Sequence, residues 1–178
     1  MKIENALSAL GTNASPRQKS ETIRALGEFL SFKSTRPDDS SIDTGPDVLW
    51  IDEENNFSIS FELKTDKGKD GNPVLYNKIK DIGQGFQHIQ WIEDNYPKVT
   101  HLGLIFVGPT GTCSSNATTN DQMYHCTEES IKTICEFFIA GIHDARNSMP
   151  IERLNKIKEL IKETLEIHSI VKKLSKKK

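Results

Sequence analysis

The stretch that sets the architecture runs from residue 46 to residue 64 and reads PDVLWIDEENNFSISFELK. Its first part, Val48–Ile51, is a short apolar run typical of a buried strand, and Asp52–Asn56 supplies the polar residues of a turn. The second part, Phe57–Lys64, alternates apolar and polar side chains, which indicates a half-buried strand with one apolar and one polar face. The stretch therefore predicts a β-hairpin.

Three charged side chains are expected to meet at the open end of this hairpin. Side chains at i and i+2 of a strand point the same way, so Glu62 and Lys64 project together from the polar face. Asp47 starts the first strand, and the turn brings that start beside the end of the second strand. Mg²⁺ usually takes one or two protein carboxylates and completes its shell with water and phosphate, and a lysine beside it can orient or deprotonate a water molecule. The hairpin thus predicts a magnesium site.

Helices are predicted on both sides of the hairpin in the sequence. Ser15, Pro16 and Gln18 form a capping-box start for a helix at about 16–31. After the hairpin, apolar residues at helical spacing predict a helix over about 75–95. The residues expected on its buried stripe are Ile79, Ile82, Phe86, Ile89 and Ile92. The later elements are a buried strand at 101–107, a loop at 110–124, a helix at 127–144 and an amphipathic helix after Pro150.

The order of these elements predicts an α/β fold with a central mixed β-sheet flanked by α-helices, and with extra C-terminal helices. The chain has 178 residues, of which 35% are hydrophobic and 27% charged, which is enough for one packed domain and excludes a disordered chain. We expect that domain over residues 1–150, followed at 151–178 by a basic amphipathic helix for packing, oligomerisation or linkage.

Composition also indicates the cellular compartment in which we expect the protein. The 23 basic and 25 acidic residues exclude a basic nucleic-acid coat protein. No apolar run reaches the ~20 residues of a membrane-spanning helix, and the N-terminus lacks the apolar stretch of a signal peptide. The three cysteines have no short-range pairing, which suits a reducing compartment. We therefore expect a cytoplasmic protein with no membrane partner.

Pro46-Asp47, a spacer of fourteen residues and then Glu62-Leu63-Lys64 resemble the motif of the PD-(D/E)xK nuclease superfamily, whose fold is restriction-endonuclease-like. The resemblance covers about residues 16–107. It implies that Asp47 and Glu62 are metal ligands, that the Leu63 carbonyl is a further ligand, and that Lys64 is the catalytic lysine.

The same resemblance suggests supporting residues from two helices. Members of the superfamily often add an acid from the helix before the motif, for which Glu21 is preferred to Glu28. They often add a glutamine from the helix after it, for which Gln84 is the first choice and Gln87 the second. His88 stands where the superfamily commonly has a tyrosine, a departure from the pattern.

The resemblance implies a Mg²⁺-dependent endonuclease, in which Mn²⁺ can replace Mg²⁺. The expected substrate is nucleic acid, with DNA preferred to RNA as the prediction. The expected setting is restriction, phage defence or DNA repair. A second copy of the chain or a helicase or effector is the expected partner. The alternative is a catalytically silent nuclease-like domain that binds nucleic acid or a protein. A plainer alternative also stays open, in which Glu62 and Lys64 form a solvated ion pair of little energetic value.

A zinc site is the weaker interpretation of the cysteines and histidines. Their spacing matches no zinc motif, and core cysteines are the better interpretation. The residues concerned are Cys113, His125, Cys126, Cys135 and His143.

Overall fold

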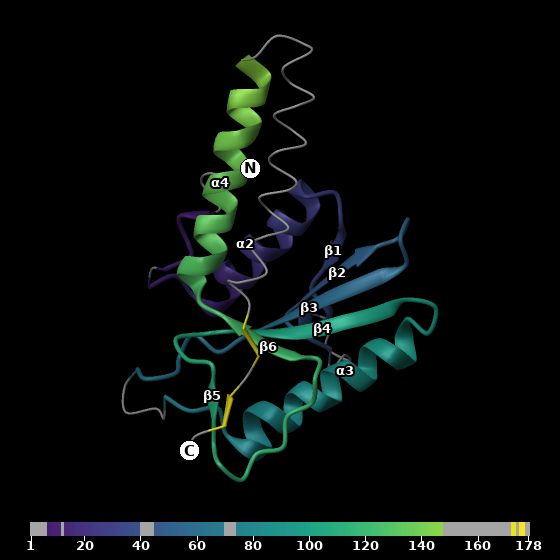
Figure 1. Cartoon of the computed structure of the whole chain (residues 1–178), viewed down its shortest axis with the longest axis vertical. Coiled ribbons are helices and arrows are strands. Elements are labelled where there is room, and N and C mark those ends of the chain that lie inside the picture. The colour runs from purple at the N-terminus through teal and green to yellow at the C-terminus, as the bar shows by residue number, and fades with distance from the viewer. Residues whose placement is uncertain are drawn as a thin grey trace.

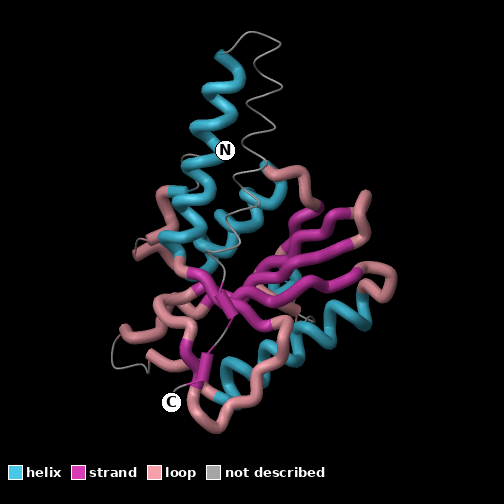
Figure 2. Tube along the Cα trace, viewed as in Figure 1, coloured by secondary structure: helices cyan, strands magenta, loops and turns pink. Residues whose placement is uncertain are grey.

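The computed structural model describes residues 7–11, 13–39, 45–69, 74–147, 172–173 and 175–176. Within them, a mixed β-sheet has the strand order β1-β2-β3-β4-β6-β7 and carries helices on both faces (Figures 1 and 2). The strands are β1 (Lys33–Thr35), β2 (Val48–Asp52), β3 (Phe57–Leu63), β4 (Thr100–Val107), β5 (Thr112–Cys113), β6 (Met123–Cys126), β7 (Lys172–Lys173) and β8 (Ser175–Lys176). The helices are α2 (Pro16–Phe29), the 3₁₀ helix η1 (Pro37–Asp39), the π-helix η2 (Lys78–Gly83), α3 (Gln84–Asn95) and α4 (Glu128–Asn147). The predicted α/β class, with a mixed sheet between helices, is confirmed.

The predicted hairpin is present and lies within the sheet. β2 and β3 pair antiparallel, with Val48 opposite Phe61 and Asp52 opposite Phe57. β3 then pairs in parallel with β4, and β4 in parallel with β6. The carboxyl ends of β3, β4 and β6 therefore meet at one edge, the edge at which ligands bind in many α/β sheets.

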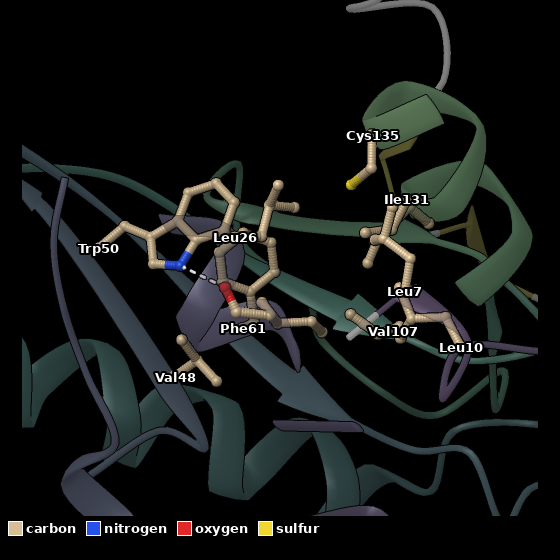
Figure 3. Packing of buried hydrophobic residues seen from close by; sticks show 11 residues of the cluster. Leu7, Leu10, Leu26, Val48, Trp50, Phe61, Val107, Ile131 and Cys135 are labelled. Carbon is tan, nitrogen blue, oxygen red and sulfur yellow. Dashed lines mark hydrogen bonds between the residues drawn. The ribbon is translucent and has the colours of Figure 1, made fainter. Parts of the chain in front are cut away.

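Helices α2 and α4 cover one face of the sheet (Figure 1). α2 begins as predicted, because the Ser15 side chain caps the Gln18 N–H and the Gln18 side chain caps the Ser15 N–H. Figure 3 shows the core beneath these helices, where Trp50 lies on Phe61 with ring centroids 4.5 Å apart and donates a hydrogen bond to the Ile23 carbonyl at 3.1 Å. The buried members of this core are Leu7, Leu10, Ile23, Leu26, Val48, Trp50, Phe61, Val107, Cys126, Ile131 and Cys135.

Helix α3 covers the opposite face, and this corrects the prediction that β3 is half exposed. Ser58, Ser60 and Glu62, the polar face of the strand, are all buried. The polar atoms find partners inside the protein: His101 lies 3.1 Å from the Ser58 hydroxyl and 3.4 Å from that of Ser60. Alternation of polar and apolar residues revealed the strand, but His101 of β4 and polar residues of the covering helix replace the water expected on that face.

The predicted helix over 75–95 is present but begins later and changes type. Residues 78–83 form a π-helix, whose wider turn shifts the phase of the helical stripe. Ile82, Ile89 and Ile92 are buried as predicted, whereas Ile79 is 81% and Phe86 39% exposed. These two positions in the predicted stripe are wrong. Ile79 lies in the π-helix, and beside Phe86 the buried position is Gly85, which lies against Leu104, Phe106 and Met123 of the sheet.

The sheet also contains strands that the sequence did not predict. β1 pairs with β2, and β6 lies partly within the predicted loop at 110–124. At the C-terminus, β7 pairs with β6 and β8 with β5, so the predicted helix over 151–178 is wrong for these four residues. The rest of that segment, and His143 as a zinc candidate, lie outside what the structure describes at side-chain level. The domain boundary at 150 stays a prediction. None of the described helices has the length and apolar character needed to cross a membrane.

Candidate active site

The hairpin register brings Asp47 beside the end of β3. Val48 pairs with Phe61, so the residue before Val48 lies opposite Glu62. The Leu63 N–H donates a hydrogen bond of 2.6 Å to Asp47 Oδ2, which holds the carboxylate against the strand end. The structure therefore brings together the aspartate, the glutamate and the lysine of the motif, at the edge where the parallel strands end.

Glu62 is the most enclosed of the three, with 3% of its surface exposed. Its Oε1 lies 2.9 Å from Lys64 Nζ, and its Oε2 lies 3.0 Å from His88 Nδ1. The second contact lacks hydrogen-bond geometry, so Oε2 is a buried oxygen without a hydrogen-bond partner. Burial favours a higher pKa for Glu62, but the neighbouring His88 and Lys64 outweigh it and the pKa is lowered. Glu62 is thus a carboxylate at neutral pH.

Lys64 is held by three groups. Its ammonium contacts Glu62 at 2.9 Å and Gln84 Oε1 at 2.9 Å, and lies 3.8 Å from Asp81 Oδ1. Burial acts to lower the pKa of Lys64, but the negative charges of Glu62, Asp81 and Asp47 raise it above its usual value. The lysine is therefore a fixed ammonium rather than a neutral amine.

Asp81 and Lys67 belong to the same network, and sequence analysis missed both. Asp81 is 1% exposed, and its Oδ2 accepts hydrogen bonds of 2.6 Å from Lys67 Nζ and 2.6 Å from the Asn77 N–H. A signal was present, because Asp81, Gln84 and His88 lie at i, i+3 and i+7, one face of a helix. A polar helix face that follows a polar strand face indicates that the two pack together.

Of the supporting residues suggested by the resemblance, some contact Glu62 or Lys64 in the structure and others do not. Gln84 contacts Lys64, whereas Gln87 is exposed and His88, the departure from the superfamily pattern, takes the inward position. Glu21 accepts hydrogen bonds from Arg24 on both carboxylate oxygens, each 2.9 Å from Nε. Its role as a metal ligand stays a prediction that these contacts do not support. The Leu63 carbonyl as a further metal ligand also stays a prediction.

No protein-family model, curated protein or solved structure matches this chain. The chemistry of the site therefore has to be argued from its own geometry.

The donor set fits a divalent cation held by two carboxylates. Among the described residues, no three or more His, Cys, Asp or Glu side chains are grouped to hold a metal, and Cys113, Cys126 and Cys135 are separate buried thiols. Mg²⁺ does not require such a group, because water and phosphate complete its shell. Asp47 and Glu62 repel each other, and Glu62 Oε2 lacks a hydrogen bond. A cation between them would relieve both.

A pocket of about 320 Å³ adjoins this site. It lies at the carboxyl ends of β3, β4 and β6, since Thr65, Gly108 and Thr127 line it. Its lining also includes three lysines, of which Lys67 contacts Asp81 in the network described above. The full lining is Gly11, Asn13, Lys19, Thr65, Lys67, Lys69, Gly108, Pro109, Thr127, Glu128 and Glu129.

Burial, and then repulsion from Glu62, raise the pKa of Asp47 from 3.8 to about 7, although the Leu63 N–H opposes the shift. Between these two values the folded protein binds more protons than the unfolded chain, so its stability falls as the pH rises from about 4 to about 7. Asp47→Asn removes this loss and keeps an oxygen for the Leu63 N–H. We expect the variant to be more stable than the wild type at about pH 8 without metal, and equal to it at about pH 4.

Urea denaturation in the presence of a chelator measures this difference. Asp52→Asn is the matched control, because hydrogen bonds from Asn55 lower the pKa of the exposed Asp52 carboxylate. That control should lose stability at the higher pH instead. A wild-type protein as stable as Asp47→Asn at about pH 8 would contradict the raised pKa of Asp47.

Proposed function

We propose that this protein is a metal-dependent nuclease of the PD-(D/E)xK superfamily, with a restriction-endonuclease-like fold, which hydrolyses phosphodiester bonds in DNA. One observation carries the proposal: Asp47, Glu62 and Lys64 converge at the open end of the hairpin, with Lys64 Nζ 2.9 Å from Glu62. A hairpin that continues into two parallel strands between helices is compatible with that fold.

The energetics of the network support a functional role. Burying an ion pair removes the hydration of both charges, so a buried ion pair is weak evidence that the contact stabilises the fold. This site nevertheless buries two carboxylates and two ammonium groups, Glu62 and Asp81 with Lys64 and Lys67. Perturbed ionisable groups gathered at one edge are typical of active sites.

In this proposal Asp47 and Glu62 hold Mg²⁺, or Mn²⁺ in its place. The bound ion supplies a Lewis acid for the phosphate and lowers the pKa of water. Lys64 is a protonated donor because its pKa is raised, so its part is to orient the attacking water and stabilise negative charge on the phosphate, not to remove a proton. Gln84 keeps the ammonium in place through its 2.9 Å hydrogen bond.

The adjoining pocket is lined by charges of both signs, and two of its three lysines are already paired, Lys67 with Asp81 and Lys19 with Glu128. DNA as the substrate therefore follows from the superfamily resemblance. Restriction, phage defence or DNA repair is the proposed setting. A second copy of the chain, or a helicase or effector, is the proposed partner that directs cleavage. Both follow from the superfamily resemblance.

The second candidate function is a catalytically silent domain that binds nucleic acid or a protein partner. One observation favours it: both Glu62 oxygens already have neighbours, Lys64 at 2.9 Å and His88 at 3.0 Å. A metal ion has to compete with these contacts. The two candidates therefore differ in whether Glu62 binds a cation.

Cleavage of plasmid and single-stranded DNA with Mg²⁺ or Mn²⁺ tests the proposal. We expect wild-type protein to cut and Glu62→Ala to lose at least about a hundredfold in rate, since it removes a metal ligand. Glu93→Ala, an exposed glutamate on α3, is the control and should cut like the wild type. Equal cutting by all three proteins defeats the assignment. Tight DNA binding without cutting by any of them favours the silent domain.

A further inference from the structure

One carboxylate oxygen of Asp81, Oδ1, is buried and has no part in the roles described above. Its Oδ2 is occupied by Lys67 and the Asn77 N–H, both at 2.6 Å. Its Oδ1 is buried and has no hydrogen-bond partner, yet it lies 3.8 Å from Lys64 Nζ. A buried carboxylate oxygen without a partner is costly, so one that persists beside a proposed catalytic lysine calls for an explanation.

The hydrogen-bond donors of Lys64 suggest an explanation for this unpartnered oxygen of Asp81. An ammonium has three N–H donors, and Lys64 donates a hydrogen bond to Gln84 and forms an ion pair with Glu62 at 2.9 Å. The third potential acceptor, Asp81 Oδ1, is too far away at 3.8 Å for a hydrogen bond. A movement of about 1 Å brings it to the usual length of a charge-assisted hydrogen bond.

We propose that Asp81 is a positioning residue: when Glu62 binds the metal, Asp81 replaces Glu62 as the carboxylate that pairs with the Lys64 ammonium. This inference rests on the proposed function. A cation bound by Glu62 shares the negative charge of its carboxylate and so weakens the ion pair between Glu62 Oε1 and Lys64. The only other close partner of the lysine in the described part of the chain, Gln84, is neutral. Asp81 supplies the replacement negative charge, so that Lys64 stays in place while Glu62 binds the ion.

A purely structural role for Asp81 is the competing explanation. Lys67 is buried, and Asp81 is its counter-ion at 2.6 Å. Asp81→Asn alone would leave the charge on Lys67 buried and unpaired, and could fail to fold for that reason. Lys67→Met removes that charge but keeps a long apolar side chain. The double variant, Lys67→Met with Asp81→Asn, therefore isolates the contact between Asp81 and Lys64.

Mn²⁺ binding by calorimetry, without DNA, is the primary measurement. We expect Lys67→Met to be less stable than the wild type, because it leaves the buried Asp81 carboxylate without its partner at 2.6 Å. It should bind Mn²⁺ no more weakly than the wild type, because Asp81 can still pair with Lys64. We expect the double variant to bind Mn²⁺ about tenfold more weakly than Lys67→Met, since Glu62 is then the one carboxylate within 4 Å of Lys64 among the described contacts. Glu93→Gln, the same kind of charge loss on the exposed side of α3, should bind like the wild type.

The outcomes separate the two proposals. Equal Mn²⁺ affinity in Lys67→Met and the double variant overturns the role of Asp81, and leaves the nuclease proposal intact if the wild type binds the metal and cuts. A wild-type protein that neither binds Mn²⁺ nor cuts DNA overturns both. A Mn²⁺-bound crystal structure adds a direct check, in which Lys64 Nζ should lie within about 3 Å of Asp81 Oδ1.

Discussion

Under the proposed function, Lys64→Met should lower the rate of Mg²⁺-dependent DNA cleavage by about 10²–10³-fold, because it removes a fixed positive donor that would face the phosphate. It should also destabilise the fold, since Glu62 Oε1 loses its partner at 2.9 Å inside the protein. Breaking a buried pair from one side costs about 3–5 kcal/mol. Cleavage assays and urea denaturation measure the two effects separately.

Two further variants make this result decisive. Lys98→Met, an exposed lysine outside the site, should match the wild type in both measurements. Lys64→Met combined with Glu62→Gln removes the unpaired charge, so it should recover most of the stability and none of the cleavage. Full activity in a folded Lys64→Met protein would rule out the catalytic role of Lys64.

Phe61→Ala should have the largest effect on stability alone. Phe61 is buried on the face of β3 opposite Glu62 and lies against Trp50, with ring centroids 4.5 Å apart (Figure 3). Truncating a buried phenylalanine to alanine costs about 3–5 kcal/mol, from lost apolar burial and from the cavity that remains. This is a large part of the ~5–15 kcal/mol that stabilises a typical domain.

Thermal and urea denaturation measure the loss. Phe86→Ala is the control, because Phe86 is 39% exposed on α3 and its removal should cost less than about 1 kcal/mol. Equal losses in the two variants would contradict the placement of Phe61 in the core. At a temperature where Phe61→Ala is still folded, DNA cleavage should persist, since Glu62 and Lys64 point to the other face.

The charge balance of the site predicts that metal binding, if the proposed function holds, is linked to protonation. The pKa of Asp47 is raised to about 7, with repulsion from Glu62 as the second cause after burial. A cation bound by both carboxylates would displace the proton from Asp47 below that pH. We therefore expect the affinity for Mn²⁺ to rise with pH up to about 7, whatever the role of Lys64.

Much of the fold could be predicted from local pattern. Alternation in Phe57–Leu63 and the apolar run of Val48–Ile51 identified both strands of the hairpin, and the Ser15 capping box identified the start of α2. The short edge strand β1 and strand β6 were missed because neither carries a periodic run long enough to recognise. The π-helix was missed because its wider turn has no signature in hydrophobic spacing.

The sequence alone determined the meeting of Asp47, Glu62 and Lys64, because strand alternation and hairpin pairing are local rules. Only the tertiary structure decided that this site is buried, and that Asp81, Lys67 and His88 complete it. Asp81 and His88 reach Lys64 and Glu62 through the packing of α3 and its π-turn on the sheet, and Lys67 reaches Asp81 from the loop after β3. Such packing depends on contacts between residues far apart in the chain, for which local periodicity carries no information.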